Sequence, residues 1–457
     1  MKQQIFEREI HVLRDTFRRL MRRHAHTNLI KLIDKTHPAD MAVLFRYFDL
    51  AEQEQLFALM RPNELTGDFL TELDESILQD LLAEISADRI AELIAPISAS
   101  DQAEILNHLP DEQSHDIIDL LKKEEAEELE EILAYPEDSA GSLMYTDVFT
   151  LHEETTARDA IAALQHEEEA EMVFYLYVTN DDNQLMGIIS LRDLVTTSPD
   201  TLLKEIMIRK VHTVRPDTDQ EEVAQVVSQY NYLAVPVTDS DNNLLGIVTV
   251  DDVVDVIREE ATEDFLKMAG VGKDREILLK SSWGNAKSRL PWLFASWLGG
   301  IAAATVIGLY ENILEATIAL AAFIPVIIGM GGNIGTQTST IIVRGLATGR
   351  VNVGNNMKIL LNEIRVGLIL GVLYGVLLGL FTSIWFMDVS PNLGIVVGLS
   401  ITTSMLIATT IGAFVPLFLY KLDVDPAVAT GPFVTTSIDI LGVTLYFLIA
   451  SLLLPLA

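Results

Sequence analysis

Residues 431–447 read GPFVTTSIDILGVTLYF, an apolar segment that contains one carboxylate, Asp439. An ionisable group deep in a membrane helix costs roughly 2.5 to 3.5 kcal/mol on insertion scales and is read by default as functional. Pro432 suits the first turn of a helix, and Thr435 and Thr436 precede Asp439 on the same face. We therefore expect a membrane helix whose carboxylate and hydroxyls bind an ion. The alternative is a structural acid that hydrogen-bonds a neighbouring helix.

Four further segments of the C-terminal part are long and apolar enough to cross a membrane. A hydrocarbon core of about 30 Å requires roughly 20 mainly apolar residues per helix. The five candidate spans are 291–310, 318–346, 359–387, 393–420 and 428–454. Lys and Arg lie before the first span, between the second and third, and between the fourth and fifth, but not in the alternate loops. Because cytoplasmic loops are enriched in these residues, we expect the N-terminus in the cytoplasm and the C-terminus outside.

Charge is distributed very unevenly along the 457 residues, whose net charge is -34. Residues 281–457 contain seven basic and seven acidic residues, so the first 280 carry the whole excess of acid. Such a field repels nucleic acid and anionic lipid and attracts cations. The chain has no Cys, which excludes disulfides, thiolate zinc sites and a cysteine nucleophile. Oxygen ligands without thiolates favour a hard cation such as Mg²⁺.

The second span reads IPVIIGMGGNIGTQTSTIIVRGLA (324–347) and is irregular in composition. Proline and four glycines within eleven residues weaken a regular helix, and broken backbone at membrane depth is tolerated where it lines a wet cavity. Its candidate ion contacts are the carbonyl groups freed near Gly329 and the side chains of Asn333, Thr336 and Thr340. The alternative is small-residue helix packing, which we prefer for the glycines of the third span. A pore on a two-fold axis would present two copies of Asp439 to a hydrated ion.

Two segments of the acidic part repeat at a spacing of 59 residues. They are LMGIISLRDLV (185–195) and LLGIVTVDDVV (244–254), each after a strand-like run and an amphipathic helix. The pattern G-x-x-[ST]-x-x-D resembles tandem CBS domains over residues 141–258. That family often binds adenine nucleotides, so the resemblance implies ATP as a candidate ligand, although many such pairs serve only as dimerising or sensing modules. The matching positions are Ser190, Asp193, Thr249 and Asp252.

Residues 1–134 are acidic and helix-periodic, with turn signals that favour a superhelix of short helices. Asp88 and Glu92 stand one turn apart after a cap and are candidate metal ligands. Between the CBS pair and the first span, acids crowd one long helix at spacings that repel. They are Asp252, Asp255, Glu259, Glu260, Glu263 and Asp264. We expect a cation to relieve this repulsion.

The acidic helical domain, the CBS pair, the five spans and the stretches GMGGNIGTQTST (329–340) and DPAVATGPFVTTSID (425–439) together resemble the MgtE family of magnesium channels. The resemblance implies a homodimer, a cytoplasmic sensor, and a plug helix that closes the pore when cytosolic Mg²⁺ is high. It implies Asp439 as the central pore residue. The sensor ligands it implies are Asp88, Glu92, Asp219, Glu221, Asp252, Asp255, Glu260, Glu263 and Asp264. Two positions depart from the family pattern: Asn231 replaces an acid and Gly431 replaces a polar residue.

The expected organisation is an all-α acidic N-domain (1–134), an α+β CBS pair (135–200 and 201–258), a plug helix (251–280) and a five-helix transmembrane domain (281–457). The expected function is Mg²⁺ influx through a channel in the bacterial cytoplasmic membrane, with Mg²⁺ also as regulator. A coupled carrier that exports Mg²⁺ or moves Mn²⁺ or Co²⁺ is the alternative. A membrane enzyme is not expected, because Asp439 has no intramembrane His or Lys partner. The expected partners are membrane lipid and a second copy, and not nucleic acid.

Overall fold

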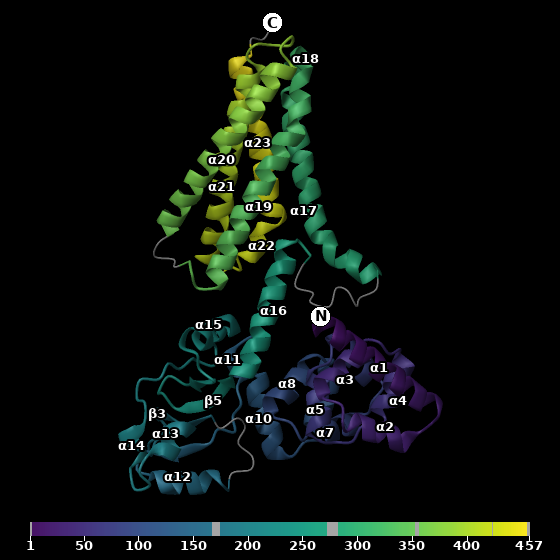
Figure 1. The fold of residues 1–457 in the computed structure, drawn as a ribbon, viewed down its shortest axis with the longest axis vertical. Coiled ribbons are helices and arrows are strands. Elements are labelled where there is room, and N and C mark those ends of the chain that lie inside the picture. Colours follow the sequence, from purple (N-terminus) through teal and green to yellow (C-terminus); the bar gives the residue numbers. More distant parts are fainter. Residues whose placement is uncertain (1, 167–173, 272–281, 352–355, 423, 455–457) are drawn as a thin grey trace. The chain divides into compact units, whose positions relative to one another are not determined.

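The computed structural model describes residues 2–166, 174–271, 282–351, 356–422 and 424–454. It divides into two compact units, Met1–Ile257 and Arg258–Ala457, called unit 1 and unit 2 below. Figure 1 shows short helices and small sheets in unit 1 and long helices in unit 2. The expected fold class is confirmed: a helical N-domain, a CBS pair and five membrane-length helices.

The N-terminal part of unit 1 is built from short helices, most of them eight residues long. They are α1 (Lys2–Arg22), α2 (His26–Ile33), α3 (Pro38–Phe45), α4 (Leu50–Phe57), α5 (Glu64–Thr71), α6 (Glu75–Leu82), α7 (Ala87–Ile94), α8 (Ala99–Asn107), α9 (Asp111–Ile118) and α10 (Lys123–Leu133). Polar caps set where several begin: Asp49 and Glu52 form a capping box at α4, and Ser98 caps α8. Helix α3 packs on α5, α4 on α6, and α5 on α7, which gives the expected superhelical arrangement.

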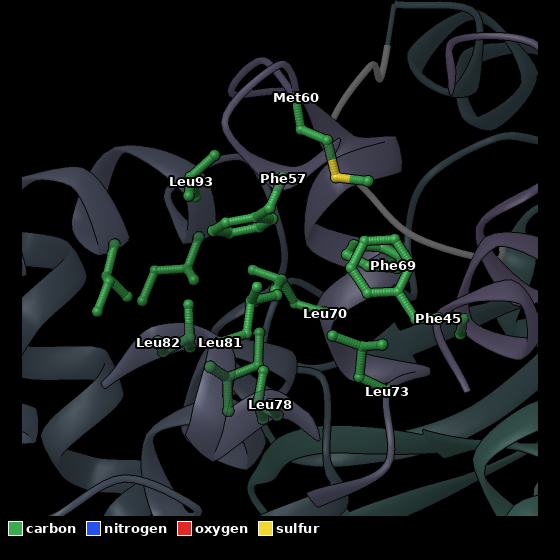
Figure 2. Close-up of a cluster of buried hydrophobic side chains, with 14 of the residues drawn as sticks. Phe45, Phe57, Met60, Phe69, Leu70, Leu73, Leu78, Leu81, Leu82 and Leu93 are labelled. Atoms are coloured by element: carbon green, nitrogen blue, oxygen red, sulfur yellow. The ribbon is translucent and has the colours of Figure 1, made fainter. Parts of the chain in front are cut away.

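The core of this N-terminal part is continuous across the helices. Figure 2 shows Phe45, Phe69 and a group of leucines from α5 and α6 packed together. The rings of Phe45 and Phe69 are 4.7 Å apart between centroids in an edge-to-face arrangement. Because each short helix buries only one face, the helices are stable as a stack rather than individually.

The second part of unit 1 holds the two repeats. It contains α11 (Ala140–Leu143), β1 (Thr150–His152), α12 (Ala157–Leu164), β2 (Tyr175–Thr179), β3 (Leu185–Ser190), α13 (Leu191–Thr196), α14 (Leu203–Ile206), α15 (Gln220–Tyr230), β4 (Ala234–Thr238) and β5 (Leu244–Thr249). Strand β2 pairs antiparallel with β3 and parallel with β1, and β4 pairs antiparallel with β5. The pair Tyr175–Ser190 and the pair Ala234–Thr249 occupy equivalent registers, so the repeat seen in the sequence is a structural repeat.

The repeat glycines have a packing role. A methyl group on Gly187 would lie 2.7 Å from the carbonyl oxygen of Ile208, and one on Gly246 would lie 2.6 Å from that of Tyr145. Both approaches are too close for any side chain, so only glycine lets these backbones meet. The helix α16 (Val250–Met268) follows β5 and covers much of the expected plug segment; residues 272–281 lie outside the described residues.

Unit 2 contains the five candidate spans. Its helices are α17 (Ser282–Leu309), α18 (Glu311–Ala316), the 3₁₀ helix η1 (Ile318–Phe323), α19 (Ile324–Ala347), α20 (Asn356–Trp385), α21 (Leu393–Tyr420), α22 (Ala427–Thr430) and α23 (Pro432–Leu453). Helices α19, α21 and α23 pack together, with α17 against α23 and α20 against α21 (Figure 1). On α20, Gly371 and Gly375 allow Thr402 of α21 to approach closely, which confirms small-residue packing in the third span.

Three sequence-based expectations about the spans need correction. The first span begins at Ser282, because α17 continues through Pro291 instead of beginning there. The fifth begins at Pro432, after the separate short helix α22, and not at 428. The second is a regular helix from Ile324 to Ala347, so its carbonyls are not freed as expected. Its proline stands in the first turn, where no N–H is required, and its glycines let neighbouring helices approach.

Candidate ion-binding site

The carboxylate of Asp439 lies beside the glycine-rich face of α19. A methyl group on Gly332 would be 3.9 Å from Oδ1 of Asp439. Asp439 is half-buried, and within the described part of the chain it makes no hydrogen bond or ion pair. The alternative of a structural acid held by a neighbouring helix therefore finds no support in the contacts of this side chain.

Three residues of α19 carry side-chain oxygens on one face, and together with Gly329 they form a stripe that is defined here as Gly329, Asn333, Thr336 and Thr340. Their spacing of four, three and four residues places them along one face of a helix. Gly329 and Asn333 are exposed and the two threonines are half-buried, whereas the opposite face is buried in the bundle. Gly332 adjoins this stripe, so Asp439 and the stripe belong to the same surface of unit 2. This surface could present one carboxylate and several neutral oxygens to an ion.

The two threonines that precede Asp439 are already engaged. Thr435 Oγ1 donates to the carbonyl oxygen of Gly431, 3.1 Å away. Thr436 packs on α17: a methyl group on Gly299 would lie 1.9 Å from its Cγ2 and 2.9 Å from its Oγ1. Gly299 is therefore a contact that lets α17 approach α23, and Thr436 has a packing role there.

A second acid inside a span was missed by the sequence reasoning, which placed Glu363 near a helix end. Helix α20 begins at Asn356, so Glu363 lies about two turns inside it. The buried Thr338 donates to Glu363 Oε2 at 3.4 Å and links α19 to α20. This acid has a structural partner, in contrast to Asp439.

The C-terminal end of α16, which belongs to unit 2, carries a buried ion cluster. Lys267 Nζ lies 2.5 Å from Asp425 Oδ2 and also contacts the buried carboxylate of Glu263. Burial acts to lower the pKa of Lys267, but its hydrogen bonds to Asp425 and Glu263 outweigh burial and raise it. Burial, and then the charge of Asp425, raise the pKa of Asp264 to about 6. Sequence reasoning missed Asp425 and Lys267 because they are distant in the chain.

The same end of α16 lies against the start of α23. The Cβ position of Gly431 is 3.7 Å from Cα of Gly270 and from the carbonyl oxygen of Lys267, and that of Gly270 is 3.7 Å from Cδ of Pro432. A Cβ at position 431 would thus be in ordinary van der Waals contact with the end of α16. These contacts join the proposed plug segment to the helix that carries Asp439.

In unit 1, the predicted sensor acid Asp252 is half-buried. Its Oδ2 accepts from Thr249 Oγ1 at 2.6 Å, and its Oδ1 accepts from Tyr145 at 3.3 Å. Burial, with a contribution from the charge of Asp101, raises the pKa of Asp252 to about 6. Asp101, in α8, also has a pKa raised by burial. Sequence reasoning missed the influence of Asp101 on Asp252, because the two residues are distant in the chain.

The remaining predicted residues lie on helix ends and exposed faces. Asp88 and Glu92 are exposed on α7, and Glu92 pairs with Arg89 at 2.9 Å. Asp219 caps α15 by accepting from the backbone N–H of Glu221 at 2.8 Å. Asp255 and Glu260 lie on α16, on either side of the boundary between the units.

The departure at Asn231 has a backbone explanation. Asn231 ends α15 in the left-handed conformation with φ +54°. Asparagine tolerates this conformation better than most residues, so it suits the helix C-cap.

The motif residues of the CBS repeats cap helices. Ser190 caps α13 and donates to Asp193 Oδ2 at 2.7 Å, as Thr249 does to Asp252. The [ST]-x-x-D pattern therefore has a local structural role in both repeats, whether or not a nucleotide binds. Among the described residues, no three His, Asp or Glu side chains form a group that could hold a metal ion.

Family models match three parts of the chain. The MgtE divalent cation transporter model matches residues 324–449, the MgtE intracellular N domain matches 36–138, and the CBS domain matches 140–200 and 203–259. The magnesium transporter MgtE of Enterococcus faecalis is 39% identical over 324 residues, which are 71% of each chain. That of Thermus thermophilus is 39% identical over 71% of this chain and 72% of the relative.

Solved structures resemble the acidic part. The soluble part of a magnesium transporter matches with a TM-score of 0.51 and 33% identity, over 55% of this chain and 99% of the other. The cytosolic domain of the Mg²⁺ channel MgtE in complex with ATP matches with a TM-score of 0.51 and 30% identity, over 53% and 99%. Five apolar helices agree with these relatives in indicating a multi-pass membrane protein. With its membrane helices, N-domain and CBS pair all matched, the chain belongs to the MgtE family of divalent cation transporters.

Proposed function

We propose that this transporter is a Mg²⁺ channel in which Asp439 binds the passing ion. The observation that carries the proposal is the half-buried carboxylate of Asp439, without a described hydrogen-bond or ion-pair partner, beside Gly332 and the polar stripe of α19. An unpaired carboxylate in a span is costly unless a cation compensates it. The neutral oxygens of the stripe suit the water shell that Mg²⁺ sheds reluctantly.

The proposed channel is a homodimer with its pore on the two-fold axis. A second copy would add a second Asp439, so two carboxylates would balance one divalent ion. Two-fold dimers are the commonest oligomers, and the exposed stripe of α19 is a surface that a second copy could face. Membrane lipid would surround the remaining helices, whose large apolar side chains are exposed in the single chain.

Gating is proposed to act through α16, whose end contacts the start of α23. Mg²⁺ bound to the acidic sensor residues would favour the closed arrangement, and its loss would leave their repulsion uncompensated. In unit 1 the half-buried Asp252, which the charge of Asp101 influences, is the proposed sensor position. The acids near Asp425 are the corresponding position in unit 2.

ATP is a further proposed ligand of the CBS pair. The support is the fold similarity to a relative crystallised with ATP, together with Ser190, Asp193, Thr249 and Asp252 at the motif positions. We also propose that the protein resides in a bacterial cytoplasmic membrane with the N-terminus in the cytoplasm and the C-terminus outside. The distribution of Lys and Arg among the loops supports this orientation.

The test is growth of a Mg²⁺-transport-deficient bacterium at limiting Mg²⁺ with this chain, with Asp439→Ala and with Asp388→Ala. Asp388 is an exposed acid in a loop and serves as the matched control. We expect rescue by the parent chain and by the control, and none by Asp439→Ala at equal membrane expression. Undiminished rescue by Asp439→Ala would refute the pore assignment.

A coupled carrier is distinguished from a channel by current. The purified chain in a planar bilayer should pass Mg²⁺ current whose reversal potential follows the Mg²⁺ gradient alone. A reversal potential that shifts with a proton or sodium gradient would identify a carrier instead.

A further inference from the structure

The first two helices carry a group of cations that the transport function does not use. Figure 1 shows α1 and α2 at the N-terminal end of the chain, and the two helices pack together. Five exposed cations run from the last turn of α1 to the residues just after α2, and they are called the basic surface here: Arg19, Arg22, Arg23, Lys31 and Lys35. Within the described part of the chain none of the five makes an ion pair.

Other arginines of α1 are already paired. Arg18 forms a double hydrogen bond with Glu52 of α4, and its Nη2 lies 2.8 Å from Glu52 Oε2. Arg14 pairs with Asp15 at the same distance. The N-domain therefore uses acids to neutralise some cations of this helix and leaves the basic surface uncompensated.

The basic surface lies outside the region that defines the family domain. Residues 1–35 contain nine Lys and Arg against four acids, although the first 280 residues as a whole carry a net charge of -34. The MgtE N-domain model begins to match only at residue 36. In the sequence, this basic helix pair therefore lies directly before the acidic family domain.

We propose that the basic surface binds the anionic phospholipid headgroups of the membrane that the chain spans. Each Lys or Arg close to an anionic bilayer strengthens binding about five-fold, and the attraction extends over about a Debye length, roughly 10 Å. Acids elsewhere on unit 1 that lie beyond this distance are screened, so the local charge of the docking face decides the interaction. Val12 of α1 is 62% exposed and adds an apolar contact.

The chain connection holds unit 1 within a limited distance of the bilayer. Only residues 258–281 separate unit 1 from the first span helix, which begins at Ser282. Residues 258–268 of this connection are helical and rise about 17 Å, and the other thirteen residues span at most about 45 Å, so the connection is at most about 60 Å long. Free nucleic acid, in contrast, has no tether that holds it near this surface. The proposal depends on the membrane spans and not on which ion is carried.

The test uses the full chain in lipid nanodiscs. Because the sequence has no Cys, Asn28→Cys on the exposed face of α2 gives one site for a fluorophore. The discs contain phosphatidylcholine alone or mixed with phosphatidylglycerol, plus a headgroup spin label that quenches the fluorophore on contact. We expect quenching only with phosphatidylglycerol, and less of it as salt rises. Combining Arg19→Gln, Arg22→Gln and Arg23→Gln should lower the docked-to-free ratio about a hundred-fold.

A matched control removes the same charge elsewhere in unit 1: Arg61→Gln, Arg192→Gln and Lys210→Gln, all exposed. Quenching should persist in this control. Equal quenching in both lipids, or quenching unchanged by the substitutions of Arg19, Arg22 and Arg23, would overturn the proposal. A second result would also overturn it: energy transfer between two labelled copies in neutral lipid that is lost when Arg19, Arg22 and Arg23 are substituted. That result would show that the basic surface binds acidic residues of a second copy of the chain. Retention of helicity and elution volume shows that each variant is folded.

Discussion

The substitution Gly332→Ala separates access to Asp439 from the packing of the bundle. The added methyl group would lie 3.9 Å from Oδ1 of Asp439, an ordinary van der Waals distance, and no other atom lies within 4 Å of it. No clash therefore destabilises the fold, and alanine favours a helix by about 1 kcal/mol relative to glycine. We expect an unchanged or slightly higher unfolding temperature.

The same methyl group should interfere with ion binding. It occupies the side of Asp439 on which a water molecule of a hydrated ion would donate to Oδ1. A hydrogen bond to a charged group contributes about 1.5 to 3 kcal/mol. Loss of one such bond, at about 2 kcal/mol, corresponds to a roughly thirty-fold loss of ion affinity.

The assay is Mg²⁺ uptake into liposomes, followed with an entrapped Mg²⁺ dye over a range of external concentrations. Two glycine variants are controls. In Gly329→Ala the methyl group meets no atom within 4 Å, so stability should again be unchanged or slightly higher. In Gly335→Ala it would lie 2.1 Å from Cδ1 of Ile438, and overpacking should lower stability by about 1 to 3 kcal/mol. A stable Gly332→Ala protein with the parent's concentration dependence would refute access to Asp439 from this face.

Three further predictions concern unit 1 and α16. The fold raises the pKa of Asp252 from 3.8 to about 6, so ionisation destabilises the folded state above pH 6 and the penalty is lost below about 4. Asp252→Asn should therefore raise the free energy of unfolding by up to about 3 kcal/mol well above pH 6 in metal-free buffer, and equal stability there would contradict it. Lys267→Met leaves the buried Glu263 and the half-buried Asp425 without their cation and should loosen the end of α16 by about 3 kcal/mol, seen as faster hydrogen exchange over residues 258–270; unchanged exchange would rule this out. Gly246→Ala places a methyl group 2.6 Å from the carbonyl oxygen of Tyr145 and should lower the unfolding temperature, whereas Gly308→Ala, in open space, should not.

The sequence by itself determined the features that depend on local composition and period. Hydropathy identified the five spans, since each must be apolar over the thickness of a bilayer. The 59-residue repeat fixed the two hairpins, which the structure places in equivalent registers. Asp439 could be recognised from the sequence alone, because a single carboxylate within an apolar helix is unusual whatever the tertiary structure. Pro432 correctly marked the start of the last helix.

Only the tertiary structure decided which residues meet. The second span was expected to be broken, yet contacts with α21 and α23 accommodate its glycines in a regular helix. Lys267 and Asp425 are 158 residues apart, and no local pattern predicts their ion pair. The approach of Gly332 to Asp439 likewise depends on how α19 and α23 pack. Hydropathy and periodicity act along the chain, whereas close packing and charge pairing depend on distances in space, and these decide which acids are compensated.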